Sequence, residues 1–303
     1  MEDVTDVAFR RLIAQYGKPD VMFTEFTSAD GLVLAPPEGQ KILRKKLAYH
    51  ESERPIVAQL FSTYPERMRE AAKIVQEMGF DGLDINMGCP VREVVNSGCG
   101  AALIKNPDLA QALVIAAQEG APNIPISVKT RIGYRVNEIE TWIPRILDSP
   151  IAALTLHLRT REEMSDVPAH WELMPRIVEI RNEQRPDVRI LGNGDVKNLP
   201  DAKKRTEEAG CDGVMLGRAI YGNPWLYANR DSPPSREETI QALIEHLRLF
   251  DELMSDTQHY AVMKKHFKAY ISGWNGAKEE RVRLMETQNT QEALTILNDI
   301  LAA

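Results

Sequence analysis

Short runs of alternating hydrophobic and polar residues recur along the first three quarters of the chain. A period of two is typical of β-strands, because successive side chains point to opposite faces of the sheet. Asp84 and Asn86, for example, alternate with Leu83, Ile85 and Met87. We predict strands at 20–25, 55–60, 81–86, 125–130, 152–158, 188–193 and 212–216.

Segments with helical periodicity separate most of these strands. Apolar residues spaced three and four apart predict amphipathic helices, because such residues share one helix face. The predicted helices span 5–16, 64–79, 107–119, 138–148, 171–184 and 199–209. Strands that alternate with helices indicate an α/β fold with a parallel sheet and helices outside it.

The number of predicted strands is one fewer than a TIM (β/α)8 barrel requires. The chain opens on a helix, so we expect a barrel lacking its first strand, which would belong before Met1. Either a truncated gene model or a real loss would explain this deficit. An open doubly wound sheet is the alternative fold.

The pattern changes near residue 235. After the sequence DSPPSREE, which has two prolines, strand patterns stop and four stretches with helical periodicity follow. We therefore expect two domains, a barrel at 1–232 and a small helical domain at 235–303.

Composition indicates an ordinary soluble globular protein, with 43% hydrophobic and 27% charged residues. Three cysteines, Cys89, Cys99 and Cys211, argue against a secreted disulfide framework, and no CxxC pair suggests a metal site. The acidic N-terminus lacks a signal-peptide pattern, and no apolar run reaches membrane-spanning length. We expect a cytoplasmic monomer with no metal and no membrane contact.

Polar residues stand at the predicted C-terminal end of every strand, where (β/α)8 barrels carry their active sites. One such residue is ordinarily a solvated loop charge or a structural histidine. A polar group at all seven strand ends predicts a large polar ligand across the barrel mouth. The residues are Glu25, Gln59, Asn86, Cys89, Lys129, Arg131, His157, Arg159, Asn193, Asp195 and Arg218.

Two glycine-containing turns narrow the choice of ligand. The sequences LGNGDV (191–196) and MLGRAIYGNP (215–224) follow the last two predicted strands, the usual phosphate site of these barrels. A phosphate there, with Lys129 and His157 towards the centre, suits FMN, because a cation stabilises the negative charge of a reduced flavin.

Several segments together resemble the bacterial tRNA-dihydrouridine synthases, and the resemblance runs through nearly the whole chain. The resemblance implies an FMN-containing TIM barrel, followed by a helical tRNA-binding domain. It also implies that NADPH drives reduction of the C5–C6 double bond of tRNA uridines to dihydrouridine. The segments are DVTDVAFR, FTEF, AQLF, DINMGCPVREVVNSGCGAALIKNP, SVKTRIG, HLRTR, NGDV and GVMLGRAIYGNPW.

The resemblance also implies roles for individual residues. Cys89 would be the catalytic acid, and Asn86 would line the flavin and the substrate. Arg159 would lie near the substrate. The cofactor-binding residues would be Gln59, Asn86, Lys129, His157, Asn193, Gly194, Asp195, Gly217 and Arg218.

The chain departs from the family pattern at three places, so we expect the flavin and substrate surroundings to differ in detail. Met1 coincides with the methionine of a segment of type APM that ends the family's first strand. Leu158 replaces a glycine. The segment EEMSDVPAHW (162–171) lacks the usual tyrosine and glycine before its tryptophan.

Cys89 precedes Pro90, which biases the cysteine away from helical backbone angles and fixes the exit of the strand. A thiol there can donate a proton at neutral pH. A small buried apolar residue is the ordinary interpretation of a free cysteine. We interpret Cys99 as a residue of a glycine-rich loop that can act as a lid, and Cys211 as a packing residue.

A cationic stretch at 263–283 predicts the RNA contact, because such charge binds phosphate. The aromatic residues between the cations are expected in the helical core. The predicted substrate-binding residues are Lys264, Lys265 and Lys268, with Lys278, Arg281 and Arg283 nearby.

Two rival functions stay open at this point. One is an FMN-barrel oxidoreductase acting on a free pyrimidine or a small enone. The other is a truncated, non-catalytic RNA-binding member, which the missing strand favours.

Overall fold

Seven strands form one sheet in the described part of the chain, and each strand lies beside the next in sequence. This computed structural model describes residues 4–228, 230 and 232–302, so Met1 lies outside the described residues. All seven predicted strands are confirmed. They are β1 (Met22–Ser28), β2 (Ile56–Phe61), β3 (Gly82–Met87), β4 (Ile126–Arg131), β5 (Ala153–His157), β6 (Arg189–Asn193) and β7 (Gly213–Met215).

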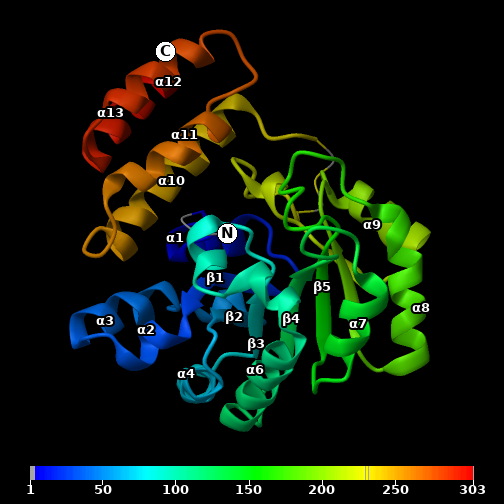
Figure 1. Ribbon diagram of the computed structural model, residues 1–303. Coiled ribbons are helices and arrows are strands. Elements are labelled where there is room, and N and C mark those ends of the chain that lie inside the picture. Colours follow the sequence, from blue (N-terminus) through cyan, green and yellow to red (C-terminus); the bar gives the residue numbers. More distant parts are fainter. Residues whose placement is uncertain (1–3, 229, 231, 303) are drawn as a thin grey trace. The chain divides into compact units, whose positions relative to one another are not determined.

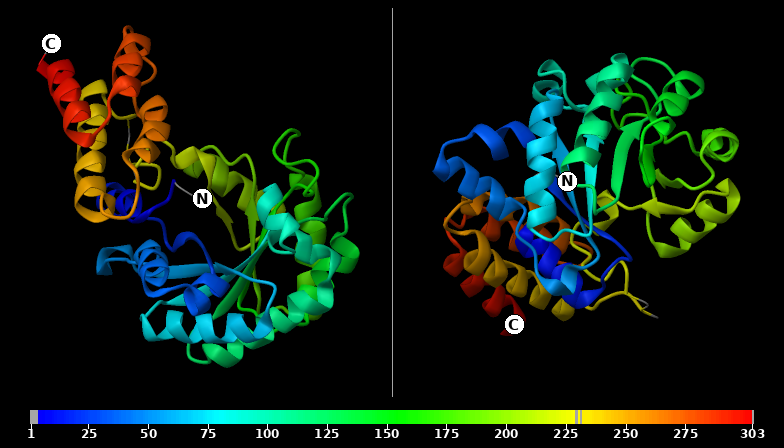
Figure 2. Two further views of the ribbon diagram at one scale, coloured as in Figure 1. Left: turned by 60° about the vertical axis from the view of Figure 1, so that its left-hand side comes forward. Right: turned by 90° about the horizontal axis from the view of Figure 1, so that it is seen from below.

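The sheet curls, and helices lie along its outer side (Figures 1 and 2). Neighbouring strands from β2 to β7 pair in parallel. The sequential strand order is that of a TIM barrel, and a doubly wound sheet, whose order reverses, is excluded. The outer helices are α4 (Pro65–Glu77), α6 (Pro107–Gly120), α7 (Ile139–Leu147), α8 (Met174–Gln184) and α9 (Leu199–Ala209).

Local sequence explains where these helices begin and end. Asn106 accepts a hydrogen bond from the backbone of Leu109 at the start of α6, and Asn198 caps α9 in the same way. Gly210 ends α9 in the left-handed conformation, at φ 66°, which glycine adopts without a steric cost.

Some short elements had no counterpart in the predicted pattern. They are the helices α2 (Ala29–Leu34), α3 (Pro37–Lys46) and α5 (Arg92–Asn96), with 3-10 turns η1 (Glu51–Glu53), η2 (Gly100–Lys105) and η4 (Arg218–Ile220). The turns η3 (Trp171–Leu173) and η5 (Tyr260–Met263) lie within stretches predicted to be helical. The helix α3 buries none of its residues, so its sequence has no core-facing stripe to reveal it.

The C-terminal segment is helical, as predicted, with no strand among its described residues. Its helices pack against one another (Figure 1). Ser235 begins the first of them in a capping box with Glu238. The helices are α10 (Arg236–Met254), α11 (Lys264–Tyr270), α12 (Ala277–Glu286) and α13 (Thr290–Ala302).

The chain divides into two compact units. One contains residues 1–25, 46–55 and 218–303, and the other contains 26–45 and 56–217. The helix α1 (Val7–Tyr16) therefore belongs with the C-terminal helices, and it contacts α10 directly. The predicted boundary near 232–235, as a division between catalysis and RNA binding, stays a prediction. None of the described helices combines the length and apolar character needed to cross a membrane.

Candidate active site

Polar side chains cover the inner face of the sheet near the carboxyl ends of its strands. Gln59 on β2 lies opposite Asp84 on β3, and Asn86 on β3 lies opposite Lys129 on β4. Side chains two residues apart on a strand share a face, and registered neighbours lie side by side. This face therefore joins β2 to β6 in one polar surface. Its members are Gln59, Asp84, Asn86, Ser127, Lys129, Arg131, Thr155, His157 and Asn193.

A carboxylate with no exposed surface lies on this face. Asp84 accepts a hydrogen bond from Ser127 Oγ at 2.6 Å and another from Gln59 Nε2 at 2.7 Å. Burial raises the pKa of Asp84 to about 6, although both hydrogen bonds and the charge of Lys129 oppose that rise. The side chain is therefore mostly ionised at neutral pH and is held by neutral donors.

The hydrogen bonds continue from this carboxylate to the cysteine. Asn86 Nδ2 donates to Gln59 Oε1 at 3.0 Å. Asn86 Oδ1 accepts from the backbone N–H groups of Gly88, at 3.1 Å, and Cys89, at 2.9 Å. A chain of side-chain amides thus connects Asp84 to the backbone of the turn that carries the thiol.

The turn at Cys89 is held from its other side as well. The Cys89 carbonyl accepts from Ala101 at 3.0 Å, and Arg131 Nε donates to the Gly88 carbonyl at 2.8 Å. Gly100 has φ 59°, and a Cβ there would lie 2.7 Å from the Cys89 oxygen. Only glycine allows this close approach, so the thiol has a fixed backbone and is 9% exposed.

Lys129 is a half-buried cation among other cations. Burial and the charge of Arg131 lower the pKa of Lys129 to about 8, although Asp84 and Cys89 oppose this shift. No hydrogen bond or ion pair reaches its amine from the residues that the structure describes. An amine in this state is well suited to an anionic or electron-rich ligand group.

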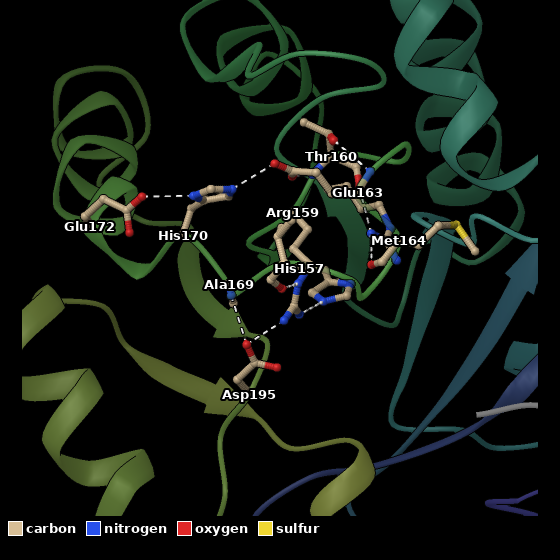
Figure 3. A network of polar contacts seen from close by, with 11 residues as sticks. His157, Arg159, Thr160, Glu163, Met164, Ala169, His170, Glu172 and Asp195 are labelled. Atoms are coloured by element: carbon tan, nitrogen blue, oxygen red, sulfur yellow. Dashed lines mark hydrogen bonds and ion pairs between the residues drawn. The ribbon is translucent and has the colours of Figure 1, made fainter.

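His157 and Arg159 form a fixed pair at the end of β5 (Figure 3). Arg159 is 2% exposed and donates from Nε to the Val167 carbonyl at 2.6 Å, from Nη2 to Asp195 Oδ2 at 2.5 Å, and from Nη1 to His157 Nε2 at 3.0 Å. Since a guanidinium cannot accept, His157 Nε2 must accept, and the ring proton of the neutral imidazole is on Nδ1.

Burial and three neighbouring cations keep His157 neutral. Burial, together with the charges of Lys129, Arg131 and Arg159, lowers the pKa of His157 to about 2. Within the described residues no hydrogen bond is made by Nδ1. His157 therefore offers one N–H donor to a ligand and cannot act as an acid near neutral pH.

The loop after β6 is tightly packed. Gly194 has φ 126°, and a Cβ there would lie 2.7 Å from the Ala169 side chain. Asp195 has φ 56°, a left-handed conformation that is uncommon for a residue other than glycine, and it accepts from the Ala169 backbone at 2.9 Å. Asn193 Nδ2 donates to the Met215 carbonyl at 2.7 Å, which joins this loop to β7.

The segment that departs from the family pattern covers these arginines. Arg131 Nη1 donates to the carbonyl oxygens of Thr160 and Met164, both at 2.9 Å. His170 contacts Glu163 through Nε2 at 2.9 Å and Glu172 through Nδ1 at 3.0 Å (Figure 3). Hydrogen bonding to Glu163 raises the pKa of His170 above its ordinary value. The loop is therefore an ordered part of the site.

The structure brings most predicted site residues onto this one surface. Gln59, Asn86 and Cys89 share one hydrogen-bonded chain, and Lys129 and His157 interact electrostatically. Arg159 lies beneath the surface and donates to protein groups only, so its predicted contact with substrate stays a prediction.

The predicted RNA lysines lie on α11, in the other unit. Lys265 and Lys268 are exposed, and Lys264 Nζ donates to the Met285 carbonyl at 2.8 Å. The aromatic residues between them are buried, with Phe267 at 0% and Tyr270 at 1% exposed, as predicted. Gly217 and Arg218 lie where the two units join in sequence, and their predicted phosphate contact is untested.

The sequence patterns did not single out two residues of the site, Asp84 and Ser127. The one available signal was that Asp84 precedes Asn86 by two residues and so shares its strand face. Among the described residues no cluster of three or more His, Cys, Asp or Glu side chains is suited to a metal ion.

Comparisons with known proteins agree with one another. The family model described as dihydrouridine synthase (Dus) matches residues 1–303. The "Probable tRNA-dihydrouridine synthase 2" of Bacillus subtilis (strain 168) is 42% identical over 99% of this chain and 91% of its own length. The "Probable tRNA-dihydrouridine synthase" of Staphylococcus aureus (strain COL) is 39% identical over 100% of this chain and 92% of its own length.

A solved complex of 2-naphthoyl-CoA reductase with 2-naphthoyl-CoA has a TM-score of 0.57 to this chain. It is 11% identical and is matched over 73% of this chain and 46% of that chain. At this level of identity the likeness shows the fold alone.

Proposed function

Because this chain belongs to the dihydrouridine synthase family, we propose that it reduces the C5–C6 double bond of uridines in tRNA, with FMN as cofactor and NADPH as electron donor. One observation of the site carries the proposal. The Cys89 thiol stands on a fixed backbone after β3, where Asn86 Oδ1 accepts from the Cys89 N–H. Asn86 lies opposite Lys129 of β4, whose amine has no hydrogen bond or ion pair with the residues that the structure describes.

The residues present fit a flavin. The Lys129 amine and the His157 Nδ1–H are unused by the described residues, and both belong to the inner face. The tight loop Asn193–Asp195, with Gly217, would hold the phosphate group, while Gln59 and Asn86 would border the ring. Bound FMN would supply a hydride to C6 of the uracil.

Reduction of the double bond also requires a proton at C5. We assign this proton to the Cys89 thiol, which breaks its S–H bond as the new C–H bond forms and is then reprotonated from solvent. His157 is excluded as the acid because its lowered pKa, about 2, keeps it neutral. Lys129 is assigned to charge stabilisation, since loss of its proton would remove the cation that a reduced flavin needs.

The exposed cations of α11 would contact the tRNA backbone. Lys265 and Lys268 are exposed, in contrast to the buried Phe267 beside them. Charge of this kind gives phosphate affinity that falls with salt. Lys264 would add to it, although its amine already donates to Met285.

The proposal is tested by turnover with unmodified tRNA and with free uridine, each with NADPH and with NADH. We expect dihydrouridine in tRNA at one NADPH consumed per residue formed, and no comparable turnover of free uridine or of a small enone. Efficient turnover of either small molecule would contradict the proposal and favour a general FMN-barrel reductase. A purified protein that binds no flavin would favour the non-catalytic alternative.

A further inference from the structure

Asp84 has no part in the proposed transfer of the hydride or of the proton. It is fully buried, yet the structure holds it with two short hydrogen bonds from Ser127 and Gln59. An ionised carboxylate in such a place costs stability, since its pKa is raised by burial. Packing alone does not explain a buried carboxylate that lowers the stability of the fold.

The reason lies in the direction of the hydrogen bonds. A carboxylate only accepts, so the end of Gln59 that faces Asp84 must be its NH2 group. The other end of Gln59, its oxygen, then faces Asn86 and must accept from Asn86 Nδ2.

The direction of the Asn86 amide determines the hydrogen bonds at the Gly88–Cys89 turn. With its NH2 group committed to Gln59, Asn86 presents its oxygen to the backbone N–H groups of Gly88 and Cys89. An Asn86 in the opposite orientation would place donors against these two N–H groups. The turn would then lose both hydrogen bonds and gain a repulsive contact.

We propose that Asp84 is a positioning residue for the thiol. Its carboxylate fixes the direction of every hydrogen bond in the chain that ends on the Cys89 backbone. Asp84 thus acts through Gln59 and Asn86, and it touches neither substrate nor cofactor. The effect of Asp84 on turnover rests on the proposed function. Its effect on the backbone of the Gly88–Cys89 turn does not.

Three variants test the proposal. Asp84→Leu removes the acceptor that sets the direction of the Gln59 amide. Asp84→Asn with Gln59→Glu moves the carboxylate one link along the chain. The amide introduced at position 84 then donates to the carboxylate introduced at position 59. That carboxylate still accepts from Asn86, so the direction at the turn is kept. Ser127→Ala removes a hydrogen bond of Asp84 without changing any direction, and it is the matched control.

Hydrogen exchange of the Gly88 and Cys89 amides is the first measurement, because it needs neither tRNA nor turnover. In Asp84→Leu we expect both amides to exchange at least about tenfold faster than in the wild type. The double variant and Ser127→Ala should stay within about threefold. Unchanged exchange in a folded Asp84→Leu protein would overturn the proposal. If Asp84→Leu does not fold, loss of protection in a folded double variant would also overturn it.

The second measurement is oxidation of the reduced flavin by tRNA. We expect it to slow about tenfold more than reduction by NADPH does in Asp84→Leu, because the thiol is displaced. Loss of the Asp84 carboxylate also lowers the pKa of Lys129, so some slowing of the NADPH step is expected as well. Equal slowing of both half-reactions would contradict positioning of the thiol. If wild-type flavin is not oxidised by tRNA, the proposed function fails, and the exchange result still decides the role of Asp84.

Discussion

At the scale of single residues, Lys129 and His157 are two groups prepared for a ligand. Lys129 keeps a proton at neutral pH, since its pKa of about 8, lowered by burial, still lies above 7. His157 keeps one N–H donor on Nδ1 because Arg159 occupies Nε2. Neither group donates to the protein in the described residues, so both are available to a flavin.

We expect Lys129→Ala and His157→Ala to weaken flavin binding by about tenfold or to slow flavin reduction, because each removes a donor that we propose to face the ring. Fluorescence titration with FMN and the rate of reduction by NADPH measure the two effects. Lys73→Ala, an exposed lysine on α4, is the matched control. Normal FMN affinity and normal reduction in both variants would show that these groups face something else.

Much of the candidate site could be predicted at this scale, but not all of it. The polar residues at strand ends could be predicted because each one stands where a predicted strand ends. Asp84 was not, because its role depends on the register of three strands, with partners 25 and 43 residues away. The burial of Arg159 was equally hidden, since Val167 and Asp195 reach it from loops that no local pattern describes.

At the scale of elements, a buried histidine pair lies where α1, α10 and α11 meet. His246 and His266 are 0% and 1% exposed, with ring centroids 4.5 Å apart. Phe9 of α1 stacks on His246 at 4.9 Å. His246 Nε2 and His266 Nδ1 have no hydrogen-bond partner in the described part of the chain. Burial lowers the pKa of His266 to about 4 and that of His246 well below its ordinary value.

The packing of these helices should therefore weaken in acid. Below the unfolded pKa of about 6.5 the unfolded chain binds protons that the folded pair refuses, so stability is lost as the pH falls from 6.5 towards 4. His266 alone should account for a loss on the order of 3 kcal/mol by pH 4. The charge of Lys265 contributes to the lowered pKa of His266, and Tyr221 and Tyr270 are titratable groups that also lie beside the pair.

Urea unfolding at pH 7 and at about pH 4.5 measures this loss. His266→Phe should flatten the pH dependence, because phenylalanine can occupy the same edge-on contact without titrating. Phe267→Leu, which removes a buried contact of the same helix without changing a titratable group, is the control and should keep the wild-type slope. A His266→Phe protein with an unchanged slope would place the acid sensitivity outside this pair.

The elements also show what the sequence allowed to be predicted. All seven strands and the helices against the sheet were found, because burial of one face imposes a regular period. The helix α3 was missed because it buries no side chain, and α2 and α5 were missed because six and five residues are too few to show a period. The grouping of α1 with the C-terminal helices depends on contacts between distant segments, such as α1 with α10.

At the scale of the whole molecule, the net charge of −7 disfavours RNA binding, whereas the cationic stretch at 263–283 favours it. Repulsion from the overall charge is screened within about 8 Å at physiological salt, whereas a local cationic surface still meets phosphate directly. The exposed Lys265 and Lys268 can therefore bind RNA in an acidic protein.

We expect Lys265→Glu with Lys268→Glu to weaken tRNA binding by about tenfold or more at low salt and to reduce the salt slope by about two, because two phosphate contacts are lost. Reduction of the flavin by NADPH should be unchanged. Lys73→Glu with Lys203→Glu changes the charge equally on the outer barrel helices and is the control. Equal weakening in both double variants would mean that only net charge matters.

The central claim of this account is that Cys89 donates the proton to the uracil. Stopped-flow flavin absorbance in Cys89→Ala tests it directly, with each half-reaction followed separately and Cys99→Ala as the control. We predict that NADPH reduces the flavin at the normal rate and that tRNA oxidises the reduced flavin about a hundredfold more slowly, the usual scale for a lost general acid. Cys99→Ala should oxidise within a few-fold of the wild-type rate. Equal rates in the two variants, or a slow step in Cys99→Ala alone, would contradict the assignment.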